Sequence, residues 1–129
     1  MLNSLKVSTT LPVSPDKVYK AWLSSKEHSA FTGGEAKIVN KVGGKFTAWD
    51  GYIMGKTLEL KPYKKIVQSW RTTEFAKSDA DSKLEIILEK VKAGTKITLI
   101  HTQIPKGGKD EYKQGWLDYY FQPMKKYFS

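Results

Sequence analysis

Apolar side chains stand at every second position near the start of the chain, and this alternation predicts a strand over residues 4–11. Ser14 then has the residue type of a helix N-cap, with Pro15 in the first helical position. Ser24 and Glu27 have the spacing of a capping box, which predicts a second short helix directly after the first. The pattern therefore begins with one strand followed by two short helices.

β-Branched and aromatic residues fill the middle of the chain in short runs separated by turn residues, which is typical of antiparallel strands. Gly43 and Gly44 predict a two-residue hairpin turn. Gly51 and Gly55 fall in the next run and indicate a bulge or a close backbone approach. The predicted strands cover residues 35–42, 45–50, 51–60, 66–75, 83–91 and 95–104.

Residues 110–129 carry aromatic and apolar side chains at helical spacing, which predicts a long helix with a wide apolar face. Acidic residues in its first turn and lysines in its last complement the helix dipole. Over about 18 residues such a helix spans roughly 27 Å, enough to cross several strands. Pro123 removes one intrahelical hydrogen bond and predicts a kink about one turn earlier. The apolar face includes Tyr112, Trp116, Tyr120, Met124 and Tyr127.

The order of these elements predicts the fold class. A run of strands with helices segregated at both ends is typical of an α+β domain. We expect a curved antiparallel sheet of about six strands wrapped around the long C-terminal helix, with residues 1–129 as a single domain. No internal repeat, low-complexity segment or linker interrupts the chain.

Composition narrows the function. The chain contains no cysteine, which excludes disulfides, thiolate catalysis and cysteine-based metal sites. Its net charge of +9 comes almost entirely from lysine, with Arg71 the one arginine. Because base recognition favours the arginine fork, and the lysines are interleaved with acids, we expect a solvated basic surface and no specific nucleic-acid site. The charge equally suits an acidic protein partner.

Neither a membrane span nor a leader is expected. No apolar run approaches the roughly 20 residues of a membrane helix. The first residues lack the apolar core and the cleavage site of a signal peptide. We therefore expect a cytoplasmic location.

Candidate catalytic motifs are weak. The two Gly-Gly-Lys sequences, at residues 43–45 and 107–109, lack the spacing and the Ser or Thr of a phosphate-binding loop. His28 and His101 have no partner at metal-ligand spacing, and we expect a surface histidine and a sheet histidine. No serine or threonine lies in a nucleophile elbow. The sequence therefore predicts no enzyme, no metal and no cofactor.

The aromatic side chains are the most informative feature, because several of them must meet between the last helix and the sheet. Core packing is one interpretation. The other is a small-molecule pocket, since such sites are concave and mostly apolar with a few polar tips. With so many rings we expect the space to be filled. The candidate pocket lining is Phe46, Trp70, Trp116, Tyr120 and Met124.

Two long stretches resemble a known family. "VGGKFTAWDGYIMGKTLELKPYKKIVQSWR" (residues 42–71) and "QGWLDYYFQPMKKYF" (residues 114–128) are similar to signature stretches of the activator-of-heat-shock-protein-90-ATPase homologue family. "SPDKVYKAW" and "AFTGG" match the family's opening helices. The likeness covers essentially the whole chain and is closer to the C-terminal domain of the eukaryotic activator. It implies the START-like, or helix-grip, fold of the SRPBCC proteins, which is also that of the birch allergens.

The resemblance also implies a function. It favours a co-chaperone-like module of the stress response that binds a heat-shock protein 90 chaperone and modulates its ATPase. The alternative is a protein that binds a small apolar ligand, such as a lipid, between the C-terminal helix and the sheet. In the implied fold Phe46 and Ala48 share one face of their strand, and Trp49 points to the other face unless a bulge near Asp50 and Gly51 re-aims it.

Overall fold

The computed structural model describes residues 2–129, and the order of its elements is the predicted one. One strand and two helices are followed by six further strands and a segmented C-terminal helix. The elements are β1 (Asn3–Leu11), α1 (Pro15–Leu23), α2 (Ser25–Thr32), β2 (Lys37–Ile38), β3 (Lys45–Ala48), β4 (Ile53–Lys61), β5 (Lys65–Thr72), β6 (Ser82–Val91), β7 (Gly94–Ile104), α3 (Lys109–Trp116), the π-helical turn η1 (Leu117–Phe121) and α4 (Gln122–Phe128).

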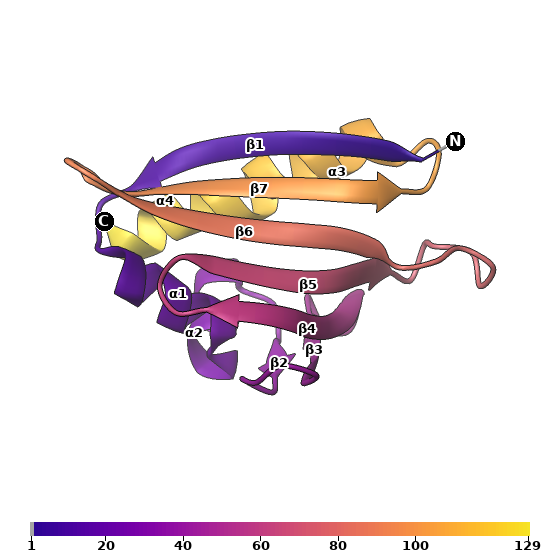
Figure 1. The fold of residues 1–129 in the computed structure, drawn as a ribbon, viewed down its shortest axis with the longest axis horizontal. Coiled ribbons are helices and arrows are strands. Elements are labelled where there is room, and N and C mark those ends of the chain that lie inside the picture. Colours follow the sequence, from indigo (N-terminus) through magenta and orange to yellow (C-terminus); the bar gives the residue numbers. More distant parts are fainter. Residues whose placement is uncertain (1) are drawn as a thin grey trace.

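The described strands form one antiparallel sheet in the order β1-β7-β6-β5-β4-β3-β2. Figure 1 shows the C-terminal helical segments lying behind this curved sheet. The predicted α+β, helix-grip architecture is therefore confirmed. The sheet has seven strands among the described residues, one more than the approximate count of six, and each of them falls in one of the strand runs predicted along the chain.

Both short helices begin where the capping pattern predicts. The side-chain oxygen of Ser24 accepts the backbone N–H of Glu27 at 3.1 Å, which is one half of a capping box. Ser14 also occupies an N-cap position, but its hydroxyl donates to the carboxylate of Asp16 instead of accepting from the backbone. The two helices therefore start at predicted residues with different capping contacts.

The hairpin predicted around Gly43 and Gly44 is present, because β2 pairs antiparallel with β3, but its predicted two-residue turn is wrong. The first strand of that hairpin ends at Ile38, which pairs with Phe46, so residues 39–44 form a longer loop. The backbone N–H of Gly43 donates across to the carbonyl of Thr57 at 2.7 Å. The carbonyl of Gly44 accepts the backbone N–H of Thr57 at 2.9 Å, so both glycines bind the loop to β4, while the N–H of Gly44 donates to the carbonyl of Lys41 within the loop.

A left-handed turn joins β3 to β4 and redirects Trp49. The backbone φ angles of Trp49, Asp50 and Gly51 are 52°, 60° and 92°, all in the left-handed region. The indole ring, which simple strand alternation would send to the outer face, instead packs edge-on against Tyr119 with ring centroids 5.7 Å apart. A turn, and not a bulge within a strand, therefore re-aims this side chain toward the C-terminal helix.

Gly55 confirms the predicted close backbone approach. A Cβ atom at this position would lie 1.9 Å from the carbonyl oxygen of Ser69 on β5 and 2.8 Å from the ring of Phe46. Neither contact leaves room for a side chain. The absence of a side chain at Gly55 therefore allows β4 to pack closely against the backbone of β5 and the ring of Phe46 on β3.

The C-terminal helix contains a π turn one turn before Pro123. The backbone N–H of Gln122 donates to the carbonyl of Leu117, five residues earlier. Pro123 has no N–H for a normal helical bond, and its ring would clash with the carbonyl of the preceding turn. A widened turn thus lies where the proline predicted a kink, and the kink itself stays a prediction. No helix within residues 2–129 is long and apolar enough to cross a membrane.

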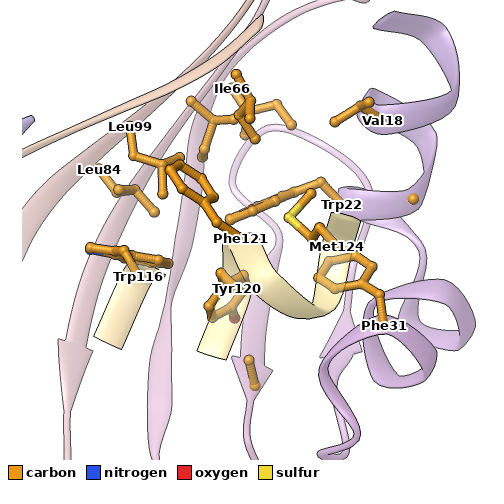
Figure 2. Packing of buried hydrophobic residues seen from close by; sticks show 14 of the residues in the cluster. Val18, Trp22, Phe31, Ile66, Leu84, Leu99, Trp116, Tyr120, Phe121 and Met124 are labelled. Atoms are coloured by element: carbon orange, nitrogen blue, oxygen red, sulfur yellow. The ribbon is translucent and has the colours of Figure 1, made fainter. Parts of the chain in front are cut away.

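The core lies between this helix and the sheet. Figure 2 shows side chains of the C-terminal helix directed toward strand residues and toward α1 and α2. Phe121 and Met124 are fully buried there, and His28 and His101 are buried among the aromatic rings. The residues labelled in Figure 2 all belong to one buried cluster: Trp116, Tyr120, Phe121 and Met124 from the C-terminal helix, with Leu84, Leu99, Ile66, Val18, Trp22 and Phe31.

Candidate functional site

A pocket of about 430 Å³ opens between the first half of the C-terminal helix and the β3–β4 turn. Its floor is made of buried side chains, and its rim is made of half-buried and exposed ones. Its volume is within the range of small-molecule sites. The lining residues are Trp49, Tyr52, Ile53, Trp70, Glu111, Tyr112, Gly115, Trp116, Tyr119 and Tyr120.

Three of the five predicted pocket residues line this space and two do not. Trp70, Trp116 and Tyr120 form part of its buried wall. Phe46 and Met124 are packed in the core away from the lining. We expected aromatic rings to fill the space between the C-terminal helix and the sheet. They do so around Phe121 and Met124, but beside Trp70 and Trp116 a pocket is left open. The role of all five residues in binding a ligand stays a prediction.

Sequence reasoning missed most of the rim. Trp49 comes to the pocket only because of the left-handed turn that follows β3, which alternation along a strand does not reveal. Glu111, Gly115 and Tyr119 could have been found, because they lie four residues apart along one side of the predicted helix. Tyr52 gave no signal that separated it from an ordinary strand residue.

Internal hydrogen bonds already occupy the polar tips of several lining rings. Trp116 donates its indole N–H to His101 at 3.2 Å, and the hydroxyl of Tyr120 lies 2.8 Å from His28 Nε2. The pocket therefore presents mainly ring surface to an occupant. Two further lining rings have hydrogen-bonded hydroxyls. The hydroxyl of Tyr52 donates to Glu74, and that of Tyr112 lies 2.9 Å from Thr72 Oγ1.

His101 lies behind the pocket in a chain of hydrogen bonds that fixes its tautomer. Its Nδ1 accepts the indole N–H of Trp116, so Nε2 carries the proton and donates to Ser82 Oγ at 2.8 Å. Ser82 in turn donates to the carbonyl of Trp70 at 2.6 Å. Burial disfavours the charged imidazolium and lowers the pKa of His101 to about 3. The neutral ring thus couples the helix to β6 and β7.

His28 is buried, so the predicted surface histidine is wrong. Its Nδ1 lies 2.9 Å from the carbonyl of Trp22 and donates to it, which leaves Nε2 to accept the hydroxyl of Tyr120. Burial lowers the pKa of His28 to about 4 and raises that of the Tyr120 hydroxyl well above its ordinary value. Tyr120, which lies 92 positions further along the chain, covers this histidine together with Trp22 and Phe31.

The described residues offer no obvious catalytic constellation. Neither histidine is hydrogen-bonded to a carboxylate within residues 2–129, because their partners are Trp22, Tyr120, Ser82 and Trp116. Over the same range no three His, Asp or Glu side chains come together in a way that could hold a metal ion. The two histidines therefore act as structural partners of the C-terminal helix.

A second surface feature lies on β4 and the loop before β3. Val42 and Leu58 are 59% and 50% exposed, and the bond from Gly43 to Thr57 holds the loop against β4. Lys45 and Lys56 are directly opposite each other on β3 and β4, where like charges repel. We call Lys41, Val42, Lys45, Lys56 and Leu58 the β3–β4 patch. It combines exposed apolar side chains with positive charge.

Comparison with known proteins identifies relatives along nearly the whole chain. The sequence model of the family described as "Activator of Hsp90 ATPase homolog 1-like protein" matches residues 12–129. The chain is 27% identical over 125 residues to the human activator of 90 kDa heat shock protein ATPase homolog 1, covering 97% of this chain and 37% of the relative. A homolog from Dictyostelium discoideum is 29% identical over 127 residues, covering 98% and 33%. The chain thus spans about a third of the length of these curated relatives.

Solved structures show the same fold. A crystal structure of an HSP90 activator from Plasmodium falciparum has a TM-score of 0.88 and 26% identity, covering 95% of this chain and 93% of that chain. The solution structure of the Aha1 dimer from Colwellia psychrerythraea has a TM-score of 0.79 at 15% identity, covering 93% and 92%, and shows the fold alone. Together with the match over residues 12–129, these findings show that the chain belongs to the family of activator-of-Hsp90-ATPase homologues.

Proposed function

We propose that this protein is a single-domain, cytoplasmic co-chaperone-like module that binds a heat-shock protein 90 chaperone and modulates its ATPase without being an enzyme itself. The observation that carries the proposal is the family match over residues 12–129. The similar chain from Plasmodium falciparum is described as an HSP90 activator, and the present chain aligns with 93% of its length. This supports a chaperone-binding role for a domain of this size.

Charge supports the same proposal and indicates a contact surface. The net charge of +9 favours association with an acidic surface of a partner. In the β3–β4 patch, Lys45 and Lys56 repel each other in the free protein, and an acidic partner would relieve that repulsion. Val42 and Leu58 would lose their exposure to water in such a contact. We propose this patch as the chaperone-binding surface.

Reversing two charges of the patch should weaken chaperone binding. For Lys45→Glu/Lys56→Glu we expect the dissociation constant to rise about tenfold at low salt, because two favourable rim charges become repulsive. The measurement is a titration of isotope-labelled protein with a purified heat-shock protein 90 chaperone, followed through amide chemical shifts. Raising the salt concentration should weaken wild-type binding as well.

The matched control is Lys90→Glu/Lys92→Glu, which changes the net charge equally at exposed positions around the end of β6. We expect its dissociation constant to stay within about threefold of wild type, because long-range charge alone is largely screened by salt. Equal weakening by both double variants would remove the patch from the proposal. The absence of any saturable shift in the wild type would refute chaperone binding itself.

A second candidate function is the binding of a small, largely apolar ligand. The observation that favours it is the aromatic pocket, whose 430 Å³ and ring-lined wall suit such a ligand. Trp70, Trp116 and Tyr120 would contact the ligand from the buried side, as the sequence predicts. This function is independent of the β3–β4 patch.

Gly115 provides a way to block the pocket without disturbing the fold. A Cβ atom there would meet only Tyr119, at 3.9 Å, so a larger side chain has open space in front of it. For Gly115→Leu we expect an intact helix, since leucine is a better helix former than glycine, and the loss of any small molecule that copurifies with the wild type. Native mass spectrometry tests this, with Gln114→Leu on the exposed side of the helix as the control. A bound molecule retained in Gly115→Leu would contradict the assignment.

A further inference from the structure

The charge of the aromatic pocket is opposite in sign to the net charge of the protein. Among its lining residues within 2–129, Glu111 is the one charged side chain. Two other surface hollows in the structure contain several lysines each, accompanied in the first by Asp16 and Glu89 and in the second by no acidic residue. One lies beside the β4–β5 turn and the other beside β1. In a protein of net charge +9, a hollow without a lysine and with a carboxylate at its rim favours a cationic occupant.

Helix α3 separates the two kinds of surface. Lys109 and Lys113 line the hollow beside β1, while Glu111 and Gly115 line the aromatic pocket. The lysines of the helix are therefore directed to a different hollow and do not neutralise Glu111. No ion pair involving Glu111 is present among the described residues. Its carboxylate is consequently available to a ligand at the pocket mouth.

The rings of the pocket suit a cation as well. Seven of the lining residues are Trp or Tyr, and the face of such a ring is electron-rich and attracts ammonium groups. The rings come from separate elements and surround the space. Trp49 and Tyr119 form the rim, and Trp70 packs edge-on against Tyr112 with centroids 5.1 Å apart. Several aromatic rings around one space are the arrangement that recognises quaternary ammonium ions.

A second carboxylate lies behind the rim. Glu74 accepts a hydrogen bond from the hydroxyl of Tyr52, one of the lining rings. A phenol that donates to an anion has a more electron-rich ring, which strengthens its attraction for a cation. The hydroxyls of Tyr52, Tyr112 and Tyr120 and the indole N–H of Trp116 are engaged inside the protein, so they offer little to a ligand that depends on hydrogen bonds.

We propose that the aromatic pocket binds an organic ammonium ion, a methylated or quaternary amine on a small apolar body, with the cationic group between the aromatic rings and the carboxylate of Glu111. The inference rests on the second candidate function and specifies the class of ligand. It commits to a small molecule and makes no use of the chaperone-binding surface.

The test compares two probes of the same shape. Choline carries a trimethylammonium group, and 3,3-dimethylbutan-1-ol has a carbon atom in place of the nitrogen. Three of the four tryptophans line the pocket, so the indole N–H signals of Trp49, Trp70 and Trp116 report binding. The fourth, Trp22, is buried outside the lining, where its N–H lies 3.3 Å from Gln68 Oε1, and serves as an internal reference. At low salt we expect choline to bind about tenfold more tightly than the alcohol.

Two charge variants distinguish a specific effect of the Glu111 carboxylate on binding from an effect of the overall charge of the helix. Glu111→Gln should weaken choline binding by about three- to tenfold and leave the alcohol unchanged. Asp110→Asn removes the same charge from the neighbouring exposed residue, which is not part of the lining, and should change neither affinity appreciably. Gly115→Leu should abolish binding of both probes. All three sites are exposed or open, so we expect these variants to fold.

Each alternative result overturns the inference in a distinct way. Equal or tighter binding of the alcohol would leave an apolar pocket and refute the preference for a cation. A choline affinity that is insensitive to Glu111→Gln, or is reduced equally by Asp110→Asn, would refute the role of Glu111. Failure of both probes to bind, together with no copurifying molecule, would refute the ligand-binding function as a whole. Chaperone binding is measured separately and would be untouched by any of these results.

Discussion

Replacing Trp116 with alanine should lower the free energy of unfolding by about 3–5 kcal/mol, the range for truncating a buried tryptophan. Trp116 is 3% exposed and contacts aromatic rings from both the sheet and the helix. Its ring centroid lies 5.5 Å from that of Trp70 and 4.9 Å from that of Tyr120. Because it borders the pocket on one side, its loss should also enlarge that pocket. Chemical denaturation measures the change.

A more conservative variant isolates the hydrogen bond of the same residue. Trp116→Phe keeps most of the buried ring surface but leaves His101 Nδ1 without its donor, which costs about 1–3 kcal/mol for a buried acceptor. Tyr119→Ala is the control, because Tyr119 is on the same helix, is 60% exposed and should contribute less than about 1 kcal/mol. If Trp116→Ala proved no more destabilising than Tyr119→Ala, Trp116 would not be the core residue that its burial indicates.

The parts of the fold that the sequence predicted are those determined by local chemistry. The capping contact of Ser24 with Glu27 involves residues three positions apart, and the helical face of residues 110–129 repeats within a few residues. Pro123 likewise acts on the turn directly before it, where the structure has its π turn. In each case the interaction that forms the element is contained in the stretch that predicts it.

The parts that failed depend on partners far away in the sequence. His28 has a polar neighbourhood in the sequence, and its burial depends on Tyr120, far away in the chain, as well as on the nearby rings of Trp22 and Phe31. Trp49 reaches the pocket through left-handed backbone angles, which its own residue type does not favour. The pocket beside Trp70 and Trp116 exists because the side chains do not completely fill the space between the C-terminal helix and the sheet. None of these quantities is contained in a local pattern.

The two buried histidines should make the protein strongly sensitive to acid. Each accepts a hydrogen bond from the C-terminal helix: His101 from Trp116 and His28 from Tyr120, one helical turn further on. A protonated imidazole can no longer accept either bond, and each ring is enclosed by aromatic groups. The contacts of His28 are Trp22, Phe31 and Tyr120, and those of His101 are Trp70, Ser82, Tyr112 and Trp116, with no carboxylate to stabilise a positive charge.

The direction of the effect follows from where the protons bind. In the unfolded chain both imidazoles take up a proton near their ordinary pKa of 6.5, whereas in the folded protein the pKa of His28 is about 4 and that of His101 about 3. Their contribution to stability is therefore complete above pH 6.5 and is lost as the pH falls toward 4 and 3. Each histidine lowers the unfolding free energy by about 1.4 kcal/mol per pH unit in that window, which gives about 4 kcal/mol for both between pH 7 and pH 5.

Denaturant unfolding at a series of pH values between 7 and 5 measures this slope. With both histidines present we expect about 2–3 kcal/mol per pH unit below pH 6, and about half of that in His28→Gln or in His101→Gln. The slope is the diagnostic quantity, because either variant also lowers stability at neutral pH through its lost hydrogen bonds. Should a variant not fold, the imidazole proton signals of the native wild type provide a second test, since they should stay unchanged down to pH 5. Titration of either ring near pH 6.5 in the folded protein would show that the histidine is accessible to water and that its bond to the C-terminal helix is not maintained in solution.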